Sequence, residues 1–358
     1  MKRMVTVGMA SALLLAGGCA CWRSGEPGDG LLPVKRLFDL TKYDAANPEG
    51  VTLYKGDVYF TARNDFRESP AQPKRPAQVM RITGDDKLEA VLTFSQDVSP
   101  LGLAFGPDGN LYVCDNQFAD DKWGKSRLLR VAFVGGKPVS VDVVATGFNH
   151  INGIAMRGSD VYVTETVLER KADGVTLGAV FKFALADLQP RKPVVVKPVA
   201  ADPHCLLTIE TRNAEVPYSA NGLTFDGEGN LFVCSFGDGV MWRATFDAKG
   251  AVASCKPWVD AQRAAGMLSL DGAHYDEVDD VVWVADLLSN SVGCIDVKRP
   301  RVKVVARNDV PYDGADGNLD TPADVIRRGD KLYVVNFNLE FGVHKATAHQ
   351  SVSVIKLK

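Results

Sequence analysis

Several features common in enzymes and nucleic-acid-binding proteins are missing from this chain of 358 residues. It has no Gly-x-Ser-x-Gly, no His-Glu-x-x-His and no glycine-rich phosphate-binding loop. These absences argue against a serine hydrolase, a zincin and a nucleotide enzyme. No Cys-x-x-Cys occurs, so the common zinc and redox motifs are absent too. The formal net charge is −3 and no dense block of lysine and arginine is present, so nothing indicates a nucleic-acid partner.

The N-terminal segment Met1–Gly18 is predicted to be a targeting signal. Lys2 and Arg3 form its positive start, and the apolar run Val5–Leu15 is too short to span a bilayer as a helix. The small residues before Cys19 resemble a bacterial lipoprotein signal, which predicts lipidation of Cys19. An ordinary secretion signal cleaved nearby is the alternative.

Both interpretations predict an exported protein. In the lipoprotein interpretation, residues 1–18 are removed, residues 19–31 form a flexible tether, and residues 32–358 form the folded domain. Ala20 follows the lipidated cysteine in place of the Asp that favours inner-membrane retention. We therefore expect a membrane anchor on the periplasmic side, with the outer membrane slightly favoured.

Beyond this segment, a pattern of strand, tight turn and strand recurs six times. Each copy has an aromatic residue at the third place of its second strand, namely Tyr59, Tyr112, Tyr162, Phe232, Trp283 and Tyr333. One position at the start of each first strand, here called the ring position, is occupied by Glu49, Leu101, Asn152, Asn221, Asp271 and Ala323. These positions are 52, 51, 69, 50 and 52 residues apart. Such a period in an all-β pattern predicts a six-bladed β-propeller of four-stranded blades, with an insertion in the third blade.

The ends of the chain predict how the ring of blades closes. The fourth strands of the first five blades are expected at Leu88–Phe94, Val139–Ala145, Val194–Val199, Ala251–Trp258 and Val302–Ala306. The last blade has only three strands, ending with Ser351–Leu357, whereas Pro33–Leu40 is a strand without a hairpin partner. Pairing Pro33–Leu40 with the last blade closes the ring and removes an exposed edge. Deletion of residues up to Leu40 is therefore predicted to unfold the domain.

The ring positions form the strongest candidate site, because the symmetry brings them to one mouth of the central channel. Glu49, Asn152, Asn221 and Asp271 would supply two carboxylates and two carboxamides. Oxygen ligands suit a hard divalent cation, with Ca²⁺ first and Mg²⁺, Mn²⁺ or Zn²⁺ as alternatives. The other interpretation is that the Asn-Gly and Asp-Gly pairs only shape turns and the channel holds water. Glu49 argues against it, because Glu is a poor turn former.

A second set of polar residues is expected near the same mouth, where the second strands end. Asp115, Glu165 and Asp286 are candidates for a general base, although the favoured interpretation of each is a solvated or hydrogen-bonded carboxylate. His344, in a loop near the end of the chain, is expected at the same mouth. The candidate substrate contacts are Asn64, Asp115, Asn116, Glu165, Asp286, Asn336 and His344. His150, just before Asn152, is a further candidate, but a lone histidine is often only a polar surface residue.

The remaining cysteines are expected to be structural. Cys114, Cys234 and Cys294 lie in predicted strands and are expected to be buried. Cys205 and Cys255 lie in outer segments of neighbouring blades and could form a disulfide after export.

The chain resembles the regucalcin/gluconolactonase family of six-bladed propellers, also named for senescence marker protein. The resemblance covers about residues 34–358 and rests on Pro48-Glu49-Gly50, Ala220-Asn221-Gly222-Leu223, Leu270-Asp271-Gly272 and the second strand at Gly229–Val233. It implies that Glu49, Asn221 and Asp271 hold a divalent metal and that Asp271 serves in lactone hydrolysis. Asn152 matches an additional Asn of paraoxonase-like lactonases. The chain departs from gluconolactonases at Asn152-Gly153, where they usually have an Asn-Asp-Gly loop, and from the paraoxonase-like enzymes at Leu101, where they place a catalytic His. The resemblance therefore covers the metal ligands better than the substrate contacts.

Two functions follow from these observations. The first is metal-dependent hydrolysis of a lactone or related ester, with Asp271 activating or positioning water. The second is a non-catalytic exported propeller, of the NHL-repeat kind, that binds a partner or carbohydrate through Trp123, Phe337 or Phe341.

Overall fold

The structure is a computed structural model that describes residues 30–64, 75–95, 97–117, 123–308, 319–338 and 340–357. The predicted signal, Cys19 and nearly all of the tether lie outside the described residues, so they stay predictions. No helix in the described ranges is long and apolar enough to cross a membrane.

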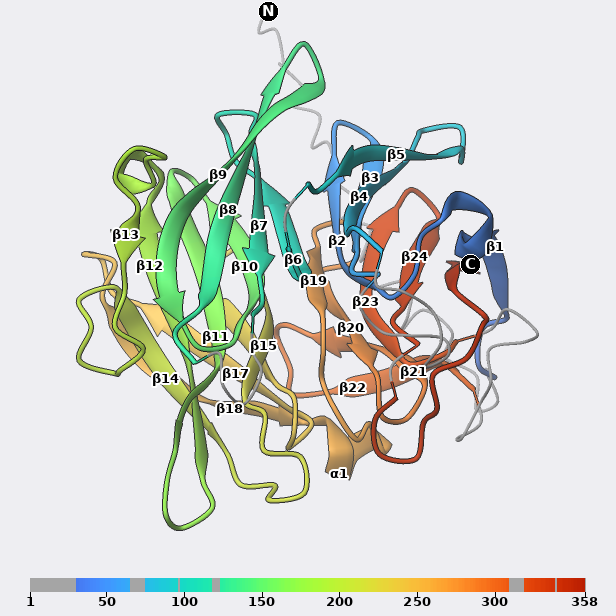
Figure 1. Cartoon of the computed structure of the whole chain (residues 1–358). Coiled ribbons are helices and arrows are strands. Elements are labelled where there is room, and N and C mark those ends of the chain that lie inside the picture. The colour runs from blue at the N-terminus through green and yellow to red at the C-terminus, as the bar shows by residue number, and fades with distance from the viewer. Residues whose placement is uncertain are drawn as a thin grey trace, which may run out of the picture.

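Six antiparallel sheets form a ring around a central channel, which confirms the six-bladed propeller (Figure 1). Blade 1 contains β2 (Pro48–Tyr54), β3 (Asp57–Ala62), β4 (Gln78–Ile82) and β5 (Leu88–Thr93). Blade 2 contains β6 (Pro100–Phe105), β7 (Leu111–Asp115), β8 (Ser126–Val134) and β9 (Lys137–Phe148). Blade 3 contains β10 (Ile151–Arg157), β11 (Asp160–Arg170), β12 (Thr176–Ala184) and β14 (Cys205–Thr211).

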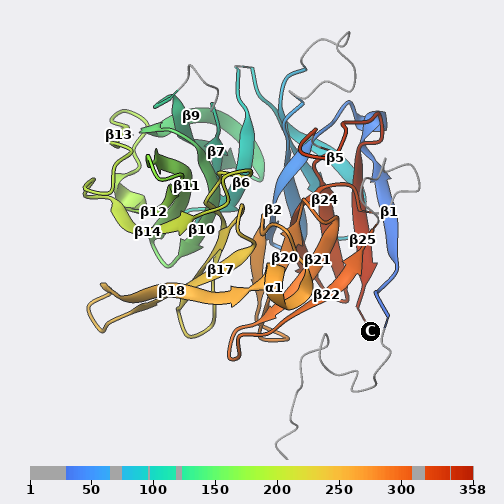
Figure 2. The same ribbon diagram turned by 90° about the horizontal axis from the view of Figure 1, so that it is seen from below.

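The second half of the ring repeats this arrangement. Blade 4 contains β15 (Ala220–Phe225), β16 (Leu231–Ser235), β17 (Val240–Phe246) and β18 (Val252–Asp260), followed by the short helix α1 (Ala261–Ala265). Blade 5 contains β19 (Ala273–Asp276), β20 (Val281–Asp286), β21 (Ser291–Asp296) and β22 (Val302–Arg307). Blade 6 contains β23 (Pro322–Arg328), β24 (Lys331–Asn336), β25 (Ser351–Lys356) and β1 (Val34–Asp39). Figure 2 shows β2 and β6 near the centre of the molecule and β1 and β18 towards its rim.

The closing strand is confirmed. β1 pairs antiparallel with β25, from Val34 opposite Ile355 to Asp39 opposite Ser351. The N–H of Leu32 also donates to the carbonyl of Val305 at 2.7 Å, which ties the start of the domain to blade 5. The ring therefore closes without leaving β25 as an open edge.

The repeated aromatic residues explain how the blades hold together. All six are buried, and each packs between its own blade and the next. Tyr112 of blade 2, for example, packs with Ile154 and Val161 of blade 3. One large residue per blade at the same place thus fills the equivalent gap six times.

The insertion in blade 3 differs from the sequence prediction. Val194–Val199 does not form the outer strand of blade 3; this strand is β14. The insertion instead crosses back to blade 2, where β13 (Val194–Val195) lies parallel to β9 as a fifth strand. Val196 then packs in the core between blades 2 and 3, and this burial explains why the segment follows the earlier blade. The extra residues thus lie in the connection from β12 to β14, residues 185–204, whereas the β11–β12 hairpin projects at the bottom of Figure 1.

The cysteine predictions are partly corrected. Cys114 and Cys234 are buried free thiols, as expected. Cys205 and Cys255 are also free, so the disulfide considered between their strands does not form. Cys294 is buried as predicted but is disulfide-bonded.

Candidate functional site

A β-bulge at the start of each blade sets the ring position. In blade 3 the pairing of β10 with β11 shifts register between Ile151 and Ile154, and blades 1, 2, 4 and 6 show the same kind of shift. In blade 5, the Asp271 N–H donates to the carbonyl of Ala285, whose own N–H donates to the carbonyl of Gly272. A bulge redirects the side chain of the extra residue, and here it presents the ring residue to the channel.

The residue after the ring position is glycine in five blades, because neighbouring blades approach closely there. A Cβ on Gly153 would lie 2.5 Å from the carbonyl oxygen of Asn221, so any side chain would push blades 3 and 4 apart. Blade 6 has Asp324 at this position instead. Its side chain enters the space beside Gly272, where a Cβ would lie 2.1 Å from an Asp324 carboxylate oxygen.

Threonine hydroxyls connect adjacent ring positions. Thr164 accepts a hydrogen bond from the Gly153 N–H and donates one to the Asn221 carbonyl, both at 2.7 Å. Thr61 connects blades 1 and 2 in the same way. These buried bonds fix the spacing of the ring independently of any ligand.

The ring side chains converge as the sequence predicts. One cavity of about 330 Å³ opens at the mouth of the channel, and its floor includes Glu49, Leu101, Asn152, Asn221 and Asp271. Each of these residues is between 3% and 7% exposed, so the polar groups face a small enclosed space. Ala323 contributes to a narrower space of about 30 Å³ deeper in the channel.

Burial and nearby negative charge oppose the ionisation of both ring carboxylates. Burial, with the nearby charge of Asp324, raises the pKa of Glu49 to about 8, against the opposing effect of Arg63. Burial, with the charges of Glu49 and Asp324, also raises the pKa of Asp271, although a hydrogen bond from Asn221 favours its charged form. A cation between these carboxylates would favour ionisation of both.

The donor set fits a hard cation only if the two asparagines take part. Among the described residues, no group of three or more His, Cys, Asp and Glu side chains is arranged to hold a metal. Glu49, Asn152, Asn221 and Asp271 together offer only oxygen donors, which suits Ca²⁺, Mg²⁺ or Mn²⁺ better than Zn²⁺.

The candidate residues at the ends of the second strands share a structural arrangement. Each uses its side chain to accept a hydrogen bond from a backbone N–H two or three residues before the ring position of its own blade. In blade 3, for example, Glu165 accepts from the N–H groups of Asn149 and His150. None of them lines the mouth cavity. The members of this set, here called the bracket residues, are Asn64, Asp115, Glu165, Asp286 and Asn336.

The other predicted substrate contacts have different positions. Asn116 lines the mouth cavity, donates to the carbonyl of Ile151 and lies 2.9 Å from the Nδ1 of His150. His150 also lines the cavity, and burial lowers its pKa to about 3, so its imidazole is neutral. His344 is buried away from the cavity, where its Nε2 lies 3.1 Å from the carbonyl oxygen of Leu288.

Several site residues have no counterpart in the sequence prediction. Arg63, Tyr218 and Phe236 line the mouth cavity, and Asp324 and His274 lie in the channel beneath it. Tyr218 and Phe236 flank the first hairpin of blade 4, but they were not predicted because only polar residues were considered as ligands. Asp324 could have been predicted from the sequence, because it stands where the other five copies of the repeat have glycine.

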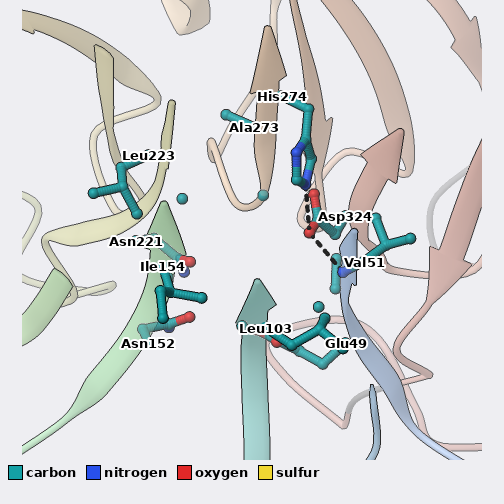
Figure 3. Close-up of a pocket in the computed structure, with 16 residues that line it drawn as sticks. Glu49, Val51, Leu103, Asn152, Ile154, Asn221, Leu223, Ala273, His274 and Asp324 are labelled. Atoms are coloured by element: carbon teal, nitrogen blue, oxygen red, sulfur yellow. Dashed lines mark hydrogen bonds and ion pairs between the residues drawn. The ribbon is translucent and has the colours of Figure 1, made fainter. Parts of the chain in front are cut away.

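The deeper channel contains an acid–histidine pair. Figure 3 shows Asp324 between His274 and Val51, across the channel from Asn152 and Asn221. An Asp324 carboxylate oxygen accepts from the Val51 N–H at 2.9 Å and lies 3.2 Å from the His274 Nε2. Burial opposes the charge on His274, but Asp324 outweighs it, so the pKa of His274 is raised.

Comparison with known proteins identifies relatives in fold. No protein-family model matches the chain, and no curated protein matches its sequence. A luciferin-regenerating enzyme has a TM-score of 0.59 at 14% identity, over 91% of this chain and 95% of that one. The calcium-binding protein regucalcin from Agrobacterium tumefaciens has a TM-score of 0.55 at 13% identity, over 91% and 95%. A protein described as a gluconolactonase has a TM-score of 0.54 at 16% identity, over 91% and 94%. The chain therefore has the six-bladed β-propeller fold that these three structures share.

Proposed function

We propose that this chain is an exported, divalent-metal-dependent hydrolase of a lactone or related ester. The observation that carries the proposal is the convergence of Glu49, Asn152, Asn221 and Asp271 on the floor of one cavity. Burial raises the pKa of both ring carboxylates, and the charge of Glu49 also raises that of Asp271, so a cation beside them would be favourable. The fold shared with a calcium-binding regucalcin and a protein described as a gluconolactonase supports the same conclusion.

The proposed ligands are the four oxygen-bearing ring residues, with Ca²⁺ as the first candidate cation. A bound divalent ion would polarise the carbonyl oxygen of the ester and so stabilise the charge that develops there. Asp271 would orient the attacking water and receive its proton. Asn116 and the neutral His150 would provide hydrogen bonds on one side of the cavity. Arg63 would limit the cost of the negative charge on Glu49.

Metal content and hydrolysis of the purified protein test this proposal. We expect one tightly held divalent ion per chain, a fall in melting temperature with chelator, and turnover within a panel of lactones and aryl esters. Glu49→Gln and Asp271→Asn should both lose the ion and the activity while remaining folded. Asp85→Asn is the matched control, because Asp85 is an exposed turn residue whose one ion pair within the described part of the chain is with Lys87.

Absence of a bound ion, with no melting shift on adding Ca²⁺ or Mn²⁺, would contradict the metal-dependent hydrolase. The search would then turn to the non-catalytic alternative, in which the mouth binds a partner or carbohydrate. Loss of partner binding in Phe337→Ala or Phe341→Ala, without any turnover, would support that alternative.

A further inference from the structure

The mouth cavity has two chemically different sides above its polar floor. Blades 1 to 3 contribute the polar side chains of Arg63, Asn116, His150 and Thr166. Blades 4 to 6 contribute a mostly apolar side, here called the aromatic wall, formed by Tyr218, Phe236, Leu287, Phe337 and Phe341. The charged residue on this side is Glu340, which is exposed and forms an ion pair with Lys345. The wall belongs to a separate small hydrophobic cluster, distinct from the six cores between the blades.

Three rings of the aromatic wall pack against one another in pairs. Tyr218 lies 6.4 Å from Phe236 and 6.2 Å from Phe341, measured between ring centroids, and Phe236 lies 6.3 Å from Phe341. All three pairs are edge-to-face, the arrangement that aromatic side chains prefer. Tyr218 also approaches the ring of His150 at 5.8 Å, and Phe337 lies beneath the guanidinium of Arg63 at 5.5 Å. The side chains of the wall thus hold one another in place.

This wall favours one kind of substituent. A polyhydroxylated ring placed there would bury hydroxyl groups against carbon, and each unpaired hydroxyl opposes binding. An alkyl or aryl group would instead remove its own surface and that of the wall from water. A cavity of about 330 Å³ has room for one small ester with such a group.

We propose that the substrate is an ester or lactone with an apolar alkyl or aryl substituent, and not a sugar lactone. The substituent lies against Tyr218, Phe236 and Phe341, with the scissile carbonyl over the ring carboxylates. This inference rests on the proposed hydrolase for the reaction, but the apolar subsite can be tested by binding alone.

Binding is measured by calorimetry on the full-length purified protein, with the non-hydrolysed lactam analogues of γ-valerolactone and γ-decalactone. The longer analogue has five more methylenes, each of which contributes about fourfold when buried. Burial of three of them should make it bind about sixtyfold more tightly. Phe236→Ala should reduce this ratio by about tenfold. Phe341→Ala, at a half-buried position, should reduce it too and serves if Phe236→Ala does not fold. Trp123→Ala should keep the ratio, because Trp123 is 41% exposed and does not line the cavity.

Hydrolysis of gluconolactone and γ-decalactone is compared in parallel. Preference for γ-decalactone in kcat/KM supports the inference. Preference for gluconolactone, or an equal affinity for both lactams, overturns it while leaving the hydrolase intact. The reverse separation is also visible: if the long lactam binds through Phe236 but no lactone is hydrolysed, the apolar subsite stands and the proposed hydrolase fails.

Discussion

Buried acidic side chains occur both at the ring positions and among the bracket residues of this propeller, and the two sets have different hydrogen-bond partners. Glu165 and Glu49 can be compared directly, because burial raises the pKa of both to about 8 and only their surroundings differ. Glu165, a bracket residue, accepts hydrogen bonds from two backbone N–H groups. Glu49 instead faces the mouth cavity and lies near Asp271, whose charge opposes its own. Burial and a raised pKa therefore do not identify a functional carboxylate here, whereas its hydrogen-bond donors do.

The largest loss of stability is expected for a substitution of Asp286, the bracket residue that accepts the most hydrogen bonds. It accepts from the backbone of Leu268, Ser269 and Ser289 and from serine hydroxyls nearby. Asp286→Ala would leave several buried donors unsatisfied and should lower the free energy of unfolding by about 3–5 kcal/mol. Urea denaturation measures this loss. A free energy of unfolding within about 0.5 kcal/mol of the parent value would contradict the structural role that separates the bracket residues from the ring carboxylates.

The next largest effect concerns Glu49 in metal-free protein. Because its pKa is raised above the ordinary value of 4.5 to about 8, its stabilising contribution is full below pH 4.5 and is lost as the pH rises through 8. Glu49→Gln should therefore match the parent at pH 5 and exceed its free energy of unfolding by about 2–4 kcal/mol near pH 8 to 9. Urea denaturation with chelator present checks this. Identical pH profiles for parent and variant would contradict it.

Glu165→Gln is the sharpest comparison, because it makes the same chemical change at a bracket position. The amide can accept only one of the two N–H bonds and presents an N–H₂ group to the other donor. We expect a loss of about 1–2 kcal/mol at pH 5, where both carboxyl groups are protonated and Glu49→Gln matches the parent. The same denaturation series measures it. Equal free energies of unfolding for the two variants at pH 5 would show that burial, and not the donor pattern, controls both sites.

The smallest effect is expected at Asp324, where glycine would restore the pattern of the other five blades. Asp324→Gly removes the acceptor of the Val51 N–H and the partner of His274, with a loss of about 1 kcal/mol. Without Asp324, burial should dominate and bring the pKa of His274 below its ordinary 6.5. A proton NMR titration of His274 measures the change. An unaltered pKa would mean that Asp324 does not set the charge in the channel.

Some features of the site could be predicted from the sequence and others could not. The repeat places equivalent residues at equivalent points of a ring, and this predicted the convergence of Glu49, Asn152, Asn221 and Asp271. The structural role of Asp115, Glu165 and Asp286 was only one of two interpretations, because their donors are backbone groups from another segment. Of the aromatic wall, Phe337 and Phe341 were named as contacts of the non-catalytic alternative. Tyr218 and Phe236 were missed, because they resemble ordinary core residues in the sequence.

The sequence by itself determined the number of blades, the closing strand and the six ring positions. Strand alternation and a near-constant period are local signals, and they survive without knowledge of any contact between blades. Only the tertiary structure decided that Val194–Val195 joins blade 2, that the bracket residues hold the backbone, and that three aromatic rings form one wall. These features depend on contacts between segments that are distant in the sequence. Burial of apolar surface and hydrogen bonding determine which of those contacts form.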